Sequence, residues 1–192
     1  FGRSGLWAVG AFYKDIDGVI EKRQVGVDAG TGKPIEMPVN AGNAKVKGLD
    51  FEVRTGLELL ALPDVSLHAN YTLQDSEVND PNTGASRRMK DHPQHLGNLI
   101  LRYGHKPLGF GASLGLNYIG KKVDETSPLT PTKTEKAFTT VDASLTQRIY
   151  GGASFFASAN NLLNEKREKQ DGLKTEREEV GRMFFAGLRF DL

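Results

Sequence analysis

The sequence predicts an all-β protein whose antiparallel strands run up and down across a membrane. Three observations predict this class. Apolar and polar residues alternate over stretches of about ten residues, the length that a tilted strand needs to cross a bilayer. The connections between these stretches alternate between short and long. No stretch keeps the apolar period of about 3.6 residues that a helix would show.

About eight strands are expected from this alternation. Four stretches show it most clearly: 49–58, 65–74, 110–119 and 184–192. Four more show it weakly: 4–16, 94–103, 138–149 and 152–163. Short connections are expected at 60–64, 104–107 and 150–152, and long ones at 17–40, 77–91, 121–135 and 165–181. A meander with one plain rim and one elaborated rim has this organisation.

The last stretch shows how the two faces differ. Its apolar positions are Phe184, Ala186, Leu188, Phe190 and Leu192, whereas the alternate positions include Arg189 and Asp191. In the four clear stretches, every second residue is aliphatic or aromatic, and Thr55 is the single exception at these positions. Alternation alone leaves two settings open, namely lipid outside a barrel or the core of a soluble, one-sided sheet.

Three features favour lipid. Each clear strand carries enough apolar positions for a band about 25 Å tall. Aromatic residues lie toward strand ends, where the interfacial girdles of membrane barrels lie: Trp7, Tyr71, Tyr103, Tyr118 and Phe190. The long connections are segregated from the short ones, which a soluble sandwich does not require.

Composition excludes several classes of protein. A net charge of +1 gives no electrostatic case for nucleic-acid binding. The chain has no cysteine, and therefore neither a disulfide framework nor a thiolate metal site. No apolar run reaches the roughly 18 residues of a transmembrane helix. The start of the chain lacks both a methionine and the features of a signal peptide, so we expect a mature product or a piece of a longer chain.

No residue pattern predicts catalysis, a cofactor or a metal. His92 and His95 form a short pair without a third ligand nearby. The alternate residues of 50–58 place Asp50, Glu52 and Arg54 on one face, which indicates a barrel wall whose charges pair with arginines such as Arg102, Arg148 and Arg189 rather than an acid–base centre. No nucleophile motif or phosphate-binding loop appears, so we expect no enzyme.

A basic cluster, Arg87, Arg88 and Lys90, lies at the base of a long connection. It is a candidate contact for an anionic metal chelate or for a lipopolysaccharide phosphate. The alternative is a solvated loop.

Five segments, in order, resemble motifs of one known family: 11–20 (AFYKDIDGVI), 39–52 (VNAGNAKVKGLDFE), 69–76 (ANYTLQDS), 160–166 (NNLLNEK) and the final strand that follows Gly181 and Arg182. On these residues the chain resembles the C-terminal part of a TonB-dependent outer-membrane receptor of the siderophore receptor family. Asp50 stands where the family usually has Glu.

The resemblance implies that residues 1–192 are a single segment, the last part of a 22-stranded barrel with a plugged lumen, without the plug domain. It implies uptake of ferric siderophores or similar metal chelates. The implied partners are outer-membrane lipid, the chelate, the TonB complex through the missing plug region, and the barrel-assembly machinery. The implied location is the bacterial outer membrane, with the C-terminus in the periplasm.

The final strand is also a candidate assembly signal, carried by Phe184, Leu188, Phe190 and Leu192. The family usually ends on Phe or Trp, and this chain ends on Leu192. Three alternatives remain open: a free-standing eight-stranded outer-membrane barrel with a structural or adhesive role, an outer-membrane enzyme, and a soluble lipocalin-like binder. Eight strands can close around an interior filled with side chains, but the charged face fits the lipocalin-like protein poorly.

Overall fold

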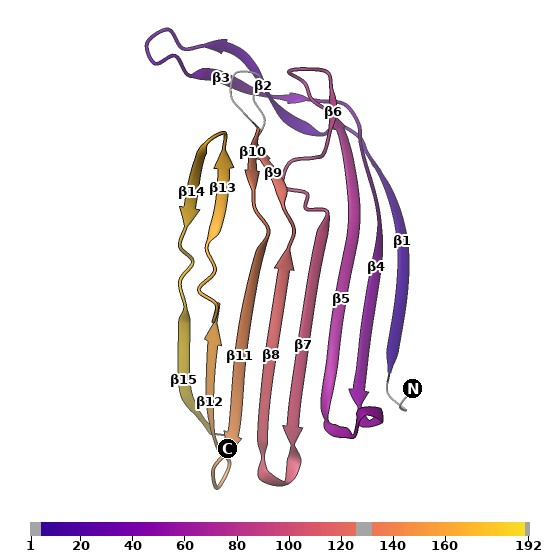
Figure 1. Cartoon of the computed structure of the whole chain (residues 1–192), viewed down its shortest axis with the longest axis vertical. Coiled ribbons are helices and arrows are strands. Elements are labelled where there is room, and N and C mark those ends of the chain that lie inside the picture. Colours follow the sequence, from indigo (N-terminus) through magenta and orange to yellow (C-terminus); the bar gives the residue numbers. More distant parts are fainter. Residues whose placement is uncertain (1–4, 126–131, 191–192) are drawn as a thin grey trace.

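The computed structural model describes residues 5–125 and 132–190. Its main feature is a curved antiparallel sheet of nine strands (Figure 1). Eight of them are long and follow one another in this spatial order: β1 (Leu6–Ile16), β4 (Ala44–Leu57), β5 (Leu62–Asn79), β7 (His95–His105), β8 (Phe110–Ile119), β11 (Phe138–Arg148), β12 (Ala153–Asn160) and β15 (Met183–Phe190). The short strand β6 (Ser86–Arg87) pairs with the end of β5.

The eight long strands confirm the all-β, up-and-down prediction, because each pairs with the next long strand along the chain. Their bounds differ most at β4 and β5, which both extend beyond the predicted stretches. In these extensions Lys45 and Lys47 pair with Glu77 and Asp75. The backbone hydrogen bonds between two strands do not require apolar side chains, so the strands continue beyond the end of the apolar pattern.

The short connections lie together at one end of the sheet, which we call the turn end. One-turn 3-10 helices form two of them, at Glu58–Leu60 and Lys106–Leu108. Each is closed by a residue in the left-handed conformation, Ala61 or Gly109. A side chain at Gly109 would collide with Arg148, so both the backbone angle and the space favour glycine there. Among the described residues there is no α-helix, and no helix is long and apolar enough to cross a membrane.

The long connections gather at the opposite end, which we call the loop end (Figure 1). The sequence predicted them as loops, but they contain further strands. A hairpin is formed by β2 (Ile20–Val27) and β3 (Pro34–Asn40). A second sheet has the order β14 (Lys174–Glu178), β13 (Arg167–Asp171), β10 (Lys133–Glu135) and β9 (Lys122–Glu125). The strands of this second sheet lack apolar alternation, because opposite charges face each other across them, as Glu168 and Arg177 do.

The register places apolar side chains from all the long strands on one face. One row across the sheet pairs Trp7, Val53, Ala69, Leu99, Leu116 and Val141 in sequence. On β5 this apolar face runs from Val65 to Leu73, about 26 Å at about 3.3 Å per residue, and Asp75 then ends it. Strands of transmembrane barrels tilt by about 35–45°, so this length covers about 20 Å of an apolar band that is about 25 Å tall.

The opposite face is polar, and its side chains bond to one another. The row beside the apolar one pairs Glu52, Asn70, Asn98, Asn117 and Thr140. Asn98 donates to Asn70 at 2.8 Å, and Thr72 donates to Asp50 at 2.6 Å. These neighbouring bonds follow from a register that brings polar residues of adjacent strands directly opposite each other.

Fully buried side chains are concentrated at the loop end. The buried apolar residues there are Ala44, Val46, Val78 and Phe138. Along the sheet the apolar face stays open: Trp7 is 63% exposed and Leu99 is 37% exposed. The described residues therefore place no protein core over this face, and an apolar phase outside the chain must cover it.

Candidate functional site

Two groups of charged residues are built at opposite ends of the sheet. At the loop end, Arg87 on β6 is enclosed between two carboxylates. Its Nε donates to Asp80 Oδ2 at 2.6 Å, and its Nη2 donates to Glu21 Oε2 at 3.0 Å. Glu21 comes from β2, so this buried cluster joins the β2–β3 hairpin to the turn between β5 and β6.

Asp80 also organises its own turn. Its Oδ1 accepts from the backbone N–H of Asn82 at 2.8 Å and of Thr83 at 3.2 Å. Burial alone would raise the pKa of Asp80, but the hydrogen bond from Arg87 and these two backbone bonds outweigh burial and hold the pKa below its usual range. Asp80 is therefore ionised wherever the cluster is intact at neutral pH.

Asn82 makes a second link to the hairpin. Its Oδ1 accepts from the backbone N–H of Gln24 at 2.7 Å, and its Nδ2 donates to the carbonyl of Lys22 at 3.1 Å. The hairpin is thus held by one buried ion cluster and by two side chain–backbone bonds. We call Glu21, Asp80, Asn82 and Arg87 the hairpin clamp.

The three basic residues predicted as an anion contact have different surroundings. Arg87 belongs to the hairpin clamp. Arg88 pairs with Asp75 at 3.3 Å, and both side chains are about half exposed. Lys90 forms a backbone bridge to Val123, and its side chain makes no ion pair with the described residues. Contact of Arg87, Arg88 and Lys90 with a ligand or with lipopolysaccharide stays a prediction.

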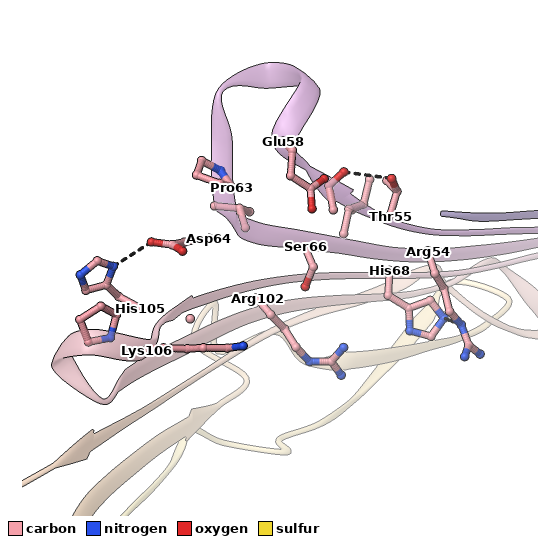
Figure 2. Close-up of a pocket in the computed structure, with 15 residues that line it drawn as sticks. Arg54, Thr55, Glu58, Pro63, Asp64, Ser66, His68, Arg102, His105 and Lys106 are labelled. Carbon is pink, nitrogen blue, oxygen red and sulfur yellow. Dashed lines mark hydrogen bonds and ion pairs between the residues drawn. The ribbon is translucent and has the colours of Figure 1, made fainter. Parts of the chain in front are cut away.

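At the turn end, the polar face encloses an open cavity of about 930 Å³ between the β4–β5 and β7–β8 turns (Figure 2). Strands β4, β5 and β7 position its charged side chains. The register sets Arg54 opposite His68, and Ser66 opposite Arg102. The two neighbouring turns add Glu58, Asp64, His105 and Lys106.

One hydrogen bond and one ion pair stiffen this cavity. His105 Nδ1 lies 2.8 Å from Asp64 Oδ2, which ties the two turns together. Arg54 Nε lies 2.6 Å from Glu52 Oε1 on its own strand and also donates to His68 at 3.3 Å. The sequence predicted that wall carboxylates pair with arginines of other strands, but Arg54 pairs with Glu52 on its own strand.

Arg102 and Lys106 extend into the cavity (Figure 2). Neither makes an ion pair or a side-chain hydrogen bond with the described residues, and both are exposed. Among the described cavity residues, no hydroxyl is hydrogen-bonded to His68 or His105. The arrangement can therefore bind an anion, but it does not activate a nucleophile.

The two histidines considered as a metal pair have different surroundings. His95 Nδ1 shares a hydrogen bond of 2.6 Å with the hydroxyl of Tyr71. Burial, together with the nearby Lys14, lowers the pKa of His92. Within the described ranges, no three His, Asp or Glu side chains converge as metal ligands.

Sequence reasoning missed the cavity and the partners of the hairpin clamp. The parity of β7 put Arg102 on the polar face, but nothing local placed Lys106 beside it. No local pattern around His105 indicated its partner. The proximity of the two turns follows from strand pairing, and the Asp64–His105 pair joins residues 41 positions apart.

Comparison with known proteins adds to this geometry. The family model described as TonB dependent receptor-like, beta-barrel matches residues 1–162. No curated protein matches the chain. Among solved structures, the ferric-catecholate import receptor Fiu from E. coli K12 superposes with a TM-score of 0.66 at 18% identity, over 97% of this chain and 25% of that one.

Two further structures agree with this fold. The siderophore receptor PiuA from Acinetobacter baumannii has a TM-score of 0.68 at 16% identity, with 97% of this chain and 26% of that one covered. The FrpB iron transporter from Neisseria meningitidis has a TM-score of 0.66 at 14% identity, with 99% and 28% covered. The chain thus spans about a quarter of the length of these solved proteins.

Proposed function

Because the chain belongs to the TonB-dependent receptor β-barrel family, whose members are receptors of the bacterial outer membrane, we propose that it forms the C-terminal barrel segment of a receptor that imports ferric siderophores or similar metal chelates. The observation that carries the proposal is the eight-strand succession itself, which superposes on iron and siderophore receptors over nearly its whole length. The segment supplies no bond chemistry, because transport needs only binding and passage.

The two edges of the sheet support a segment of a larger barrel. In the described residues, β1 pairs only with β4, and β15 pairs only with β12. A free-standing eight-stranded barrel with a structural or adhesive role would need β1 to pair with β15. Unpaired edges are costly in lipid, so further strands of the same receptor are proposed to cover them. The plug domain is proposed to lie outside residues 1–192 as well.

The two rims support an orientation. The turn end is built of short connections and the loop end of long, folded ones. Membrane barrels have short periplasmic turns and longer extracellular loops. We therefore assign the loop end to the outside and the turn end, with the C-terminus, to the periplasm.

Two site assignments accompany this orientation. With this orientation, Arg88 and Lys90 lie on the extracellular side, next to Arg87 of the hairpin clamp. There they fit an anionic chelate or a lipopolysaccharide phosphate. The alternating strand with Phe184, Leu188, Phe190 and Leu192 fits an assembly signal that the barrel-assembly machinery reads; Leu192 lies outside the described residues. The TonB complex would act through the plug.

The test is iron uptake by cells that carry or lack the complete receptor gene. Radiolabelled iron is offered as catecholate, hydroxamate, carboxylate and haem complexes. The proposal expects deletion to abolish uptake of at least one complex, and expects a protonophore to abolish the same uptake in the parent strain. Unchanged uptake of all complexes, with slower growth under membrane stress instead, would favour the structural barrel.

A further inference from the structure

Each of the three connections at the turn end carries apolar side chains that the described residues leave exposed. Leu59 in the β4–β5 turn is 75% exposed, Leu108 in the β7–β8 turn is 67% exposed, and Tyr150 in the β11–β12 turn is 87% exposed. Leu60 and Ile149 lie next to them in sequence and are exposed as well. Apolar side chains gathered on three neighbouring turns indicate a surface that contacts something other than water. We call Leu59, Leu60, Leu108, Ile149 and Tyr150 the apolar tips.

The apolar tips do not belong to the turn-end cavity. Two of the same turns contribute Glu58 and Lys106 to the cavity wall (Figure 2), whereas none of the apolar tips lines it. In these two turns the charged residues therefore face the cavity, and their apolar neighbours face the surroundings of the sheet. Anything that fills the cavity would leave the apolar tips uncovered.

The height of the apolar face indicates what covers the apolar tips. With strand tilt included, the apolar face of β5 is about 5 Å shorter than the usual apolar band of a membrane barrel. At the loop end, the charged pair Lys47 and Asp75 follows directly on the same face, so the missing height does not lie there. At the turn end, the apolar tips follow the last strand pair, Leu57 with Leu62, and continue the apolar surface.

The polar backbone groups of the turns already have partners. In the β7–β8 turn, the N–H of Gly109 donates to the carbonyl of Lys106 at 3.0 Å. On the neighbouring strand β11, Gln147 Nε2 donates to the carbonyl of Leu108 at 2.8 Å. The other two turns also close backbone hydrogen bonds of their own. Paired backbone groups lower the free-energy cost of placing these turns next to lipid.

We propose that the three turns of the turn end are inserted in the periplasmic leaflet of the outer membrane, where the apolar tips contact phospholipid. The boundary of the apolar layer then lies beyond the last strand pairs and not at them. Tyr150 suits this boundary, because its ring is apolar and its hydroxyl can reach water. The inference rests on the proposed function, whose orientation puts the turn end on the periplasmic side.

The arrangement of the apolar tips favours lipid over a periplasmic protein. From the β4–β5 turn to the β11–β12 turn, the tips extend over four strand spacings of about 4.8 Å, or about 19 Å along a curved rim. A protein partner would have to follow this curve, whereas lipid surrounds the rim of a barrel at every point. The tips are also continuous with the apolar face, so one apolar phase can cover both.

The test uses the complete receptor in native outer membranes. A photo-crosslinking residue replaces Leu59 or Leu108, and the adducts are identified by mass spectrometry. The matched controls replace Glu58 and Lys106, which belong to the same turns but line the cavity. Leu101, on the apolar face of β7, is the positive control for contact with lipid. Phospholipid adducts are expected at positions 59, 108 and 101, and their loss is expected at positions 58 and 106.

A second measurement needs no substitution in the receptor. The complete receptor is reconstituted in vesicles of dioleoyl phosphatidylcholine that contain a phosphatidylcholine with a photoreactive group on its acyl chain. After illumination, the labelled peptides are identified by mass spectrometry. Peptides that contain the apolar tips should be labelled together with those of the apolar face. Peptides of the β2–β3 hairpin, at the opposite end of the sheet, should remain unlabelled.

Three results would overturn the inference: a periplasmic protein as the main adduct at positions 59 and 108, a lipopolysaccharide adduct there, or no adduct there while position 101 is labelled. The last result leaves the proposed function intact, because the apolar face would still contact lipid. Absence of lipid at position 101 as well would contradict both the inference and the proposed barrel. None of these results depends on which chelate the receptor imports.

Discussion

At the scale of single residues, the hairpin clamp is the most constrained feature of the molecule. Arg87 contacts two carboxylates, and Glu21 and Asp80 are only 8% and 5% exposed. Neighbouring Arg88 makes one pair at the surface. Two adjacent arginines therefore have different energetic roles, which the sequence alone does not distinguish.

This difference predicts unequal effects of two matched substitutions. Arg87→Met leaves two buried carboxylates facing each other and should destabilise hairpin docking by about 3–5 kcal/mol. Arg88→Met removes an exposed pair that contributes about 0–1 kcal/mol. Tryptic cleavage after Lys22 and Arg23 in β2 measures docking, and only Arg87→Met should accelerate it. Equal cleavage rates in the two variants would contradict this role of the clamp.

The pKa of Asp80 predicts how the clamp responds to acid. This pKa is lowered in the folded protein, so its contribution to stability is present above the unfolded value of about 4 and is lost as pH falls through the folded value. The protection of the hairpin amides against hydrogen exchange, taken relative to the intrinsic exchange rate at each pH, should stay high from neutral pH to about pH 5 and fall below about pH 4. Asp80→Asn serves as the control: its hairpin should exchange faster at neutral pH and respond less to acid.

The sequence located the basic cluster but not its partners. Glu21 lies 66 residues from Arg87, and only the folding of the β2–β3 hairpin toward β6 brings them together. The same holds for the cavity, where strand pairing joins turns that are distant in sequence. Local spacing therefore predicts which face a charge occupies, but the partner of that charge depends on tertiary geometry.

At the scale of elements, the strands that could be predicted are those with two chemically different faces. All eight long strands were found from their alternation. The loop-end strands β9, β10, β13 and β14 were missed, since their polar cross-strand pairs leave no apolar period. A pair of strands whose side chains are polar on both faces has the same kind of sequence as a loop. The strands β2 and β3 were missed for another reason: Ile35, Met37 and Val39 alternate on β3, but this stretch is short and is interrupted by Pro34 and Pro38.

Close packing on the polar face gives a prediction at this scale. The ring of Phe12 lies over Gly48, and a Cβ there would come within 2.7 Å of the carbonyl of Leu73 and 2.8 Å of Phe12 Cε1. Gly48→Ala should destabilise the β1–β4–β5 region by about 1–3 kcal/mol through overpacking.

Gly10 provides the matched control on the same strand pair. A Cβ at Gly10 would lie 3.9 Å from its nearest neighbour, in Asp50. Gly10→Ala should therefore leave stability unchanged or slightly raised. The denaturant midpoint of the full receptor in detergent measures both variants, and an equal loss in both would contradict the packing argument.

At the scale of the whole molecule, the chain is a curved sheet whose two faces differ in polarity and whose turn end and loop end differ in structure. The apolar face continues across all the long strands, the polar face carries bonded side chains and the turn-end cavity, and the loop end contains the buried core. Each property follows from strand register, because a shift by one residue would exchange the two faces.

Assembly of this sheet gives one further prediction. If the final strand is an assembly signal, Leu192→Phe restores the aromatic end typical of the family and should leave insertion unchanged or improve it. The yield of heat-modifiable, folded receptor in outer membranes measures insertion. Phe190→Ser is the opposing control and should reduce the yield. A loss of insertion in Leu192→Phe would contradict the proposed signal.

The central claim is that the apolar face of this sheet contacts lipid while its polar face lines a barrel interior. Four neighbouring positions of β7 test it most directly, since Leu99 and Leu101 lie on one face and Ile100 and Arg102 on the other. Nitroxide labels at these positions of the complete receptor in membranes report collisions with oxygen, which concentrates in lipid. High collision rates at 99 and 101 and low rates at 100 and 102 are predicted. A collision rate at position 100 as high as that at position 99 would contradict the account. So would collision rates that do not alternate along β7.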